Sequence, residues 1–98
     1  MMTINEMKEN FKFVMDKGSK LKKELEANFI SKNATLRYIG NGKAIIEWTK
    51  ESYNDSDIYY EIEVGLDEYS IRIYYQSYKN VAKVSEDFEV IEYLLSMS

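Results

Sequence analysis

The sequence predicts an α+β fold: a long N-terminal helix, a four-stranded antiparallel sheet made of two hairpins, and a C-terminal helix, with both helices packed on one sheet face. Three observations lead to this class. The first 30 residues carry an apolar stripe with helical spacing, and a shorter stripe of the same kind ends the chain. Between them lie four strand-like segments separated by turn residues. With 98 residues, the chain is expected to form a single domain, residues 1–98.

The first helix is expected over residues 4–30. Thr3 and Glu6 form a capping-box pattern, which places the helix start at Ile4. Gly18 costs about 1 kcal/mol relative to alanine inside a helix, so two shorter helices are the alternative. One continuous helix is favoured because the apolar positions keep their phase across this glycine. These positions are Ile4, Met7, Phe11, Val14, Gly18, Leu21, Leu25 and Phe29.

The length of this helix does not match that of the sheet. A helix over residues 4–30 is about 40 Å long, whereas strands of about seven residues reach about 23 Å. The sheet therefore cannot cover the whole apolar stripe. Either a kink at Gly18 turns the helix back onto the domain, or the overhanging part pairs with another chain.

The first hairpin is expected to join strands 34–39 and 43–49 through Gly40-Asn41-Gly42. A two-residue loop would mix polar and apolar side chains on each face of the hairpin. A three-residue loop with Gly42 in the left-handed conformation instead gives one wholly apolar face. Its pairs are Tyr38 with Ala44, Leu36 with Ile46, and Ala34 with Trp48.

The second hairpin is expected to join strands 57–66 and 69–76 through a turn at Asp67-Glu68. Its inward pairs are all apolar or aromatic: Leu66 with Tyr69, Val64 with Ile71, Ile62 with Ile73, and Tyr60 with Tyr75. Its outward pairs include an opposite-charge pair, which stabilises a sheet. They are Glu63 with Arg72 and Glu61 with Tyr74.

The final helix is expected to follow a connector over residues 77–83. Ser85 is predicted as its N-cap. Glu86 and Asp87 follow in the first turn, where negative charge is favourable beside the positive end of the helix dipole. Its buried stripe is predicted to consist of Phe88, Ile91 and Leu95, with Val84 and Leu94 beside them.

The composition argues against an enzyme. The chain has no His and no Cys, so it lacks the side chain that titrates near neutral pH and the commonest soft metal ligands. Asp55-Ser56-Asp57 resembles the start of a calcium loop, but Tyr60 and Leu66 occupy the positions of the required glycine and glutamate. Glu61 and Glu63 share a flat strand face rather than a cleft. We therefore expect no catalytic residues, no metal and no cofactor. With no signal peptide or membrane span apparent, we expect a cytoplasmic location.

The charge is distributed unevenly along the chain. Residues 1–43 hold nine basic and five acidic side chains, whereas residues 44–98 hold four basic and twelve acidic ones. The segment 51–71 contains seven acids and no Lys or Arg, and tyrosines are frequent around it. Tyrosine supplies contact area at low entropic cost, and acids steer a basic partner. The predicted partner-binding residues are Tyr53, Asp55, Asp57, Tyr59, Glu61, Glu63, Asp67, Glu68 and Tyr74.

The leading functional hypothesis is a small acidic protein-binding module that recognises a basic protein surface. In its sharper form it is an inhibitor from a phage or mobile element, which mimics DNA charge and covers the nucleic-acid-binding surface of a host defence or DNA-processing protein. This is an analogy of size and charge with anti-CRISPR and anti-restriction proteins. We expect no direct binding of nucleic acid, because the acidic face repels phosphate, and no membrane partner. The alternative is a homodimeric adaptor that associates through the first helix or a sheet edge.

Overall fold

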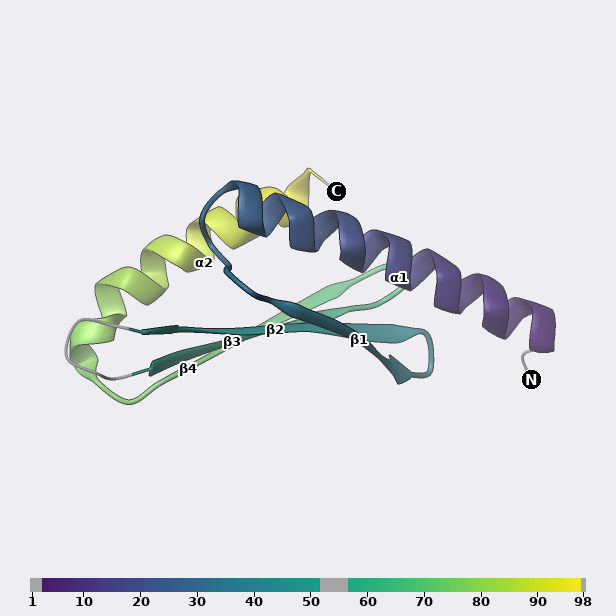
Figure 1. Ribbon diagram of the computed structural model, residues 1–98, viewed down its shortest axis with the longest axis horizontal. Coiled ribbons are helices and arrows are strands. Elements are labelled where there is room, and N and C mark those ends of the chain that lie inside the picture. Colours follow the sequence, from purple (N-terminus) through teal and green to yellow (C-terminus); the bar gives the residue numbers. More distant parts are fainter. Residues whose placement is uncertain (1–2, 52–56, 98) are drawn as a thin grey trace.

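The computed structural model describes residues 3–51 and 57–97. Both helices lie on one face of a four-stranded antiparallel sheet with the order β1-β2-β3-β4 (Figure 1). This arrangement confirms the predicted fold class. The elements are α1 (Ile4–Ala27), β1 (Thr35–Gly40), β2 (Lys43–Glu51), β3 (Asp57–Val64), β4 (Tyr69–Tyr75), the 3₁₀ turn η1 (Tyr78–Asn80) and α2 (Val81–Ser96).

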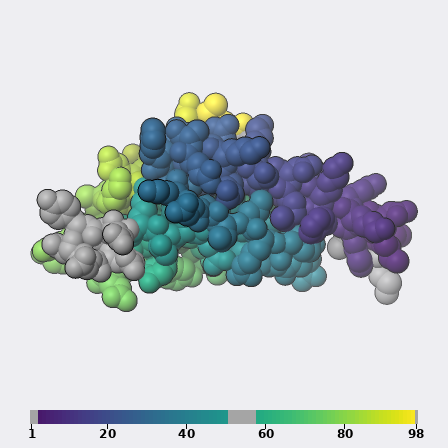
Figure 2. All heavy atoms as spheres, in the orientation of Figure 1, coloured from purple at the N-terminus to yellow at the C-terminus, as the bar shows by residue number. Residues whose placement is uncertain are grey.

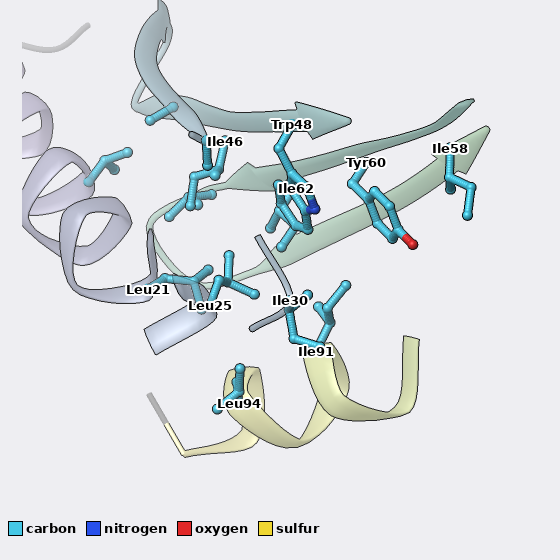
Figure 3. Packing of buried hydrophobic residues seen from close by; sticks show 14 residues of the cluster. Leu21, Leu25, Ile30, Ile46, Trp48, Ile58, Tyr60, Ile62, Ile91 and Leu94 are labelled. Carbon is cyan, nitrogen blue, oxygen red and sulfur yellow. The ribbon is translucent and has the colours of Figure 1, made fainter. Parts of the chain in front are cut away.

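The hydrophobic core lies between the sheet and the two helices. In Figure 3, Trp48, Tyr60 and Ile62 extend from the sheet toward the helices, where Leu21, Leu25, Ile91 and Leu94 meet them. The rings of Trp48 and Tyr60 are stacked, with centroids 4.9 Å apart and planes 2° apart. Alternation along each strand thus sends one set of side chains into the core and leaves the opposite sheet face uncovered by helices.

Helix α1 is continuous through Gly18, as predicted. Its N-cap also behaves as expected, because the Thr3 hydroxyl accepts a hydrogen bond from the Glu6 amide at 3.1 Å. A Cβ atom built on Gly18 would lie 2.8 Å from Leu36 Cδ1 of β1. Glycine at this position therefore lets the helix approach the sheet closely.

The C-terminal end of α1 differs from the prediction. The helix stops at Ala27, where the Asn28 side chain donates to the Glu24 carbonyl at 2.8 Å. Phe29 then takes a left-handed conformation with φ 60° and is exposed, so its predicted place in the buried stripe is wrong. The reversal of the chain at this point turns Ile30 into the core instead.

The N-terminal end of α1 projects beyond the sheet. Figures 1 and 2 show this end, in purple, extending past the other elements without a bend, while Phe11 still packs against Tyr38 of β1 with ring centroids 4.8 Å apart. Val14 is fully buried, whereas Ile4, Met7 and Phe11 of the same stripe are exposed. The predicted overhang is thus present, and the alternative of a kink at Gly18 is wrong.

The first hairpin has the predicted pairing but a different turn. Tyr38 pairs with Ala44 and Leu36 with Ile46, as the apolar face requires. The turn itself has two residues, Asn41 and Gly42, with φ of 55° and 70°. A β-bulge between Tyr38 and Gly40 adds the extra residue, and this restores the register that a two-residue turn alone would shift.

The second hairpin has the predicted faces but not the predicted pairs. Ile62 lies opposite Ile71 and Glu61 opposite Arg72, a shift of two residues from the expected register. Strand β3 ends at Val64, and the Gly65 amide donates to the Glu68 carbonyl at 2.8 Å, so the turn spans Gly65 to Glu68. A shift of two residues keeps every side chain on its face.

Helix α2 begins at Val81, four residues before the predicted cap. Ser77 caps the preceding 3₁₀ turn, where its hydroxyl accepts from the Lys79 amide at 3.3 Å, and Ser85 lies within the helix. The inward stripe consists of Asp87, Ile91 and Leu94, while Phe88 is exposed. The predicted cap and the burial of Phe88 are therefore wrong.

In the described part of the chain, neither helix combines the length and the hydropathy that a membrane span needs.

Candidate functional site

The predicted partner-binding residues are distributed over the whole length of the β3–β4 hairpin. Tyr59, Glu61, Glu63 and Tyr74 share the outward face, away from the helices. The exposed residues Asp67 and Glu68 lie in the turn at one end of the hairpin, remote from Tyr59 and Tyr74 at the other end. Asp57 opens β3. Tyr53, Asp55 and the side chain of Asp57 lie outside what the structure describes.

Tyr59 and Tyr74 form a cross-strand pair on the outward face. They lie directly opposite each other in β3 and β4, and they are 48% and 54% exposed. Both line an open groove of about 1060 Å³ that extends across the sheet to the loop before β1. The other residues that line it are Lys32, Asn33, Thr35, Glu47, Trp48, Thr49, Lys50, Tyr60 and Glu61. The pair is thus an aromatic surface within a concave region lined by both polar and aromatic side chains.

The carboxylates of this face have cationic neighbours. Glu47 and Glu61 lie opposite each other in β2 and β3, an unfavourable like-charge pair. Two ion pairs reduce this repulsion: the Arg37 guanidinium lies 2.9 Å from the Glu47 carboxylate, and the Arg72 guanidinium lies 3.5 Å from the Glu61 carboxylate.

Glu63 has two cationic neighbours, Lys43 at 3.2 Å and Arg72 at 3.7 Å. Three cations therefore balance three carboxylates among the described side chains of the outward face. This face is not the array of free negative charges that the sequence suggested.

Arg72 connects the charged and aromatic parts of the face. A hydrogen bond to Tyr74 and the nearby charge of Glu61 raise the pKa of the Arg72 guanidinium above its ordinary value. This contact places the guanidinium beside Tyr74 of the tyrosine pair.

The turn of the second hairpin carries acids beside a lysine from α1. The Lys17 ammonium donates to the carbonyls of Gly65 and Leu66 at 3.2 and 3.3 Å, and it lies 4.3 Å from the centroid of the Tyr69 ring. Asp67 and Glu68 remain exposed to solvent beyond this contact.

A second polar cluster, centred on Asp87, escaped the sequence analysis. Asp87 is 2% exposed and accepts from the Tyr60 hydroxyl and from Lys50 at 3.0 Å, while Lys83 lies at 3.4 Å. Burial, followed by the hydrogen bond to Asp87, raises the pKa of Tyr60. Three donors surround this carboxylate, so the cluster connects β2, β3 and α2. The spacing of Asp87 with Ile91 and Leu94 is the signal that places it on the buried face.

In the described ranges, no group of three or more acidic side chains is placed to hold a metal ion. Comparison of the chain with protein-family models, curated proteins and solved structures finds no match.

Proposed function

We propose that this protein is a small non-enzymatic protein-binding module whose outward sheet face forms the binding surface. The observation that supports the proposal is the half-exposed Tyr59–Tyr74 pair in the groove of the uncovered face. Tyrosines are enriched at the energetically important positions of protein interfaces, since they bury a large apolar ring and offer a hydroxyl.

The proposed partner presents a basic surface. The chain carries a formal charge of −4, and the acids Asp67 and Glu68 are exposed at the turn end of the same hairpin. Long-range attraction of this kind accelerates association and selects partners of opposite charge. Glu61 and Glu63 already have cationic neighbours, so the proposal assigns recognition mainly to the tyrosines.

An inhibitor that mimics DNA is the narrower form of this proposal. Such a protein needs carboxylates free to replace phosphates, and the ion pairs of the outward face do not favour it. The inhibitor role and the cytoplasmic location stay predictions from the sequence.

The test uses the immobilised protein to retain partners from a cell extract. We expect a retained protein that is lost when Tyr59→Ser and Tyr74→Ser are combined, because both rings leave the groove. The matched control combines Tyr78→Ser with Tyr93→Ser, which removes two exposed tyrosines elsewhere on the molecule. Equal retention by the two double variants would exclude the outward face as the binding surface.

A salt series tests the proposed charge of the partner. If electrostatic attraction to a basic surface supports the complex, retention should fall as the salt concentration rises. Retention that is unchanged by salt would argue against a basic partner but not against the tyrosine surface.

A further inference from the structure

Strand β4 forms an edge of the sheet. It pairs with β3 on one side, and within residues 3–51 and 57–97 no strand pairs with its other side. Its seven residues contain no proline, no lysine and no bulge in the register with β3. Natural proteins use proline, charged side chains and bulges to block unwanted strand pairing at an edge. The one charge on β4, Arg72, is paired with Glu61 and Glu63 of β3, so the free side of β4 is open to an added strand.

An apolar groove accompanies this edge. It lies between β4 and α2 and is lined by Tyr69, Ile71, Phe88, Glu92, Leu95 and Ser96. On α2, Val81, Phe88 and Leu95 recur every seven residues and so lie along one side of the helix. Val81 and Phe88 are exposed, although both are apolar. The edge therefore offers a strand side that no described strand pairs with, next to the exposed apolar side chains of Val81 and Phe88.

We infer that a second copy of this chain occupies this edge, with the two β4 strands antiparallel around a two-fold axis. A two-fold interface requires a surface that is complementary to itself. The helical stripe meets this requirement: with Phe88 at the axis, Val81 lies opposite Leu95 of the second copy. Glu92 then lies opposite Val84 of the second copy rather than opposite another acid. Two copies of the stripe thus match in size and avoid like charges.

The strand satisfies the same symmetry. With Ile73 on the axis, Ile71 faces Tyr75 of the second copy on the inward side. On the outward side, Arg72 faces Tyr74 of the second copy, a favourable cation and aromatic pair. A register centred on Arg72 would instead oppose two guanidinium groups, which is destabilising. Ile71, the inward neighbour of Ile73 on β4, lines the same groove as Phe88, so the centres of the strand pair and of the helix pair lie along the same stretch of the edge.

The resulting dimer has one continuous eight-stranded sheet. Its two outward faces join across the new strand pair, so two Tyr59–Tyr74 pairs lie on a single surface. This inference goes beyond the proposed binding function and does not rest on it, because its tests measure self-association in solution and not the binding of another protein.

The first test measures the mass of the protein in solution by analytical ultracentrifugation over a range of concentrations. We expect the wild-type chain to dimerise and Phe88→Glu to weaken dimerisation at least about 100-fold, since it places two carboxylates at the axis. Met7→Glu is the control, because Met7 is an exposed apolar residue on the overhang of α1. It should leave the dimer unchanged.

The second test compares two substitutions at one exposed position. Tyr74→Arg sets a second guanidinium against Arg72 of the second copy and should weaken the dimer about tenfold, whereas Tyr74→Glu should maintain or strengthen it. If Phe88→Glu disturbs folding, this comparison still tests the proposed pairing of the two β4 strands.

Three results would overturn the inference. They are a wild-type monomer at every concentration, a dimer that both Phe88→Glu and Tyr74→Arg leave intact, and a dimer that Met7→Glu dissociates.

Discussion

At the scale of single residues, Asp87 shows how a carboxylate becomes part of the core. Taking one charge out of water costs several kcal/mol unless partners replace the lost hydration. Here Tyr60, Lys50 and Lys83 supply these partners from three elements. Their convergence fixes how α2 rotates on the sheet and so determines which side of the helix faces the solvent.

We expect Asp87→Ala to lower the free energy of unfolding by about 3 kcal/mol, because it leaves Lys50 and the Tyr60 hydroxyl without their acceptor. Urea denaturation measures this change. Asp67→Ala removes an exposed carboxylate of the turn and should change stability by less than about 0.5 kcal/mol. Similar effects of the two substitutions would mean that the buried cluster does not stabilise the fold.

Tyr60 should make stability sensitive to alkaline pH. Its pKa is raised in the folded state, so the unfolded chain loses this proton first, near pH 10, while the folded chain keeps it. The stabilising contribution is complete below about pH 10 and falls by about 1.4 kcal/mol per pH unit above it. Tyr60→Phe should remove this part of the slope. Parallel stability profiles for wild type and Tyr60→Phe above pH 10 would contradict the assignment.

At the scale of elements, α1 and the strand faces were predictable because their patterns are periodic. The phase of the stripe across Gly18 correctly indicated one helix. What the pattern could not supply was the reason for the glycine, which is a contact with Leu36, 18 residues later in the chain. Tertiary contacts of this kind have no local signature.

Gly18→Ala should show this contact as an energetic coupling. Alanine favours the helix by about 1 kcal/mol over glycine, but its Cβ would lie 2.8 Å from Leu36 Cδ1, so that side chain must move. We expect Gly18→Ala to raise the free energy of unfolding by less than this amount in the wild-type protein, and by the full amount when Leu36→Ala is also present. Thermal unfolding of the wild type, the two single variants and the double variant gives the coupling energy between Gly18 and Leu36. Equal gains in both backgrounds would show that Leu36 does not restrict this position.

The registers of the two hairpins were only partly predictable. Alternation decides which face a side chain occupies, and this part of the prediction is confirmed in both hairpins. A shift of two residues preserves the alternation, so it is invisible to this reasoning. The hydrogen bond from Gly65 to Glu68 and the bulge at Gly40 depend on backbone geometry and decide the actual turns.

The candidate site was also predictable only in part. Alternation correctly placed Tyr59, Glu61 and Tyr74 on the uncovered face. The ion pair of Glu63 with Arg72 was predicted. The contribution of Lys43 was missed because it reaches Glu63 across the pairing of β2 with β3, which joins the two hairpins. The cluster of Asp87 was missed because an acid near the start of a helix is more typical of a solvated position.

At the scale of the whole molecule, two surfaces remain available for partners. The protein is elongated, 49 × 23 × 20 Å, with helices over one sheet face and the other face open. The open face carries the tyrosine pair with balanced charges, and the β4 edge carries an apolar groove. Among the described side chains of residues 44–98, the acids without a cationic neighbour on the sheet face lie in the turn and on α2, at Asp67, Glu68, Glu86, Glu89 and Glu92.

The central claim is that the uncovered sheet face binds a protein partner through Tyr59 and Tyr74. NMR spectra of the tyrosine rings, recorded as the retained partner is added, test it most directly. We predict that the ring signals of Tyr59 and Tyr74 shift or broaden while those of Tyr78 and Tyr93 stay in place. Unchanged signals for Tyr59 and Tyr74 in a saturated complex would contradict the claim.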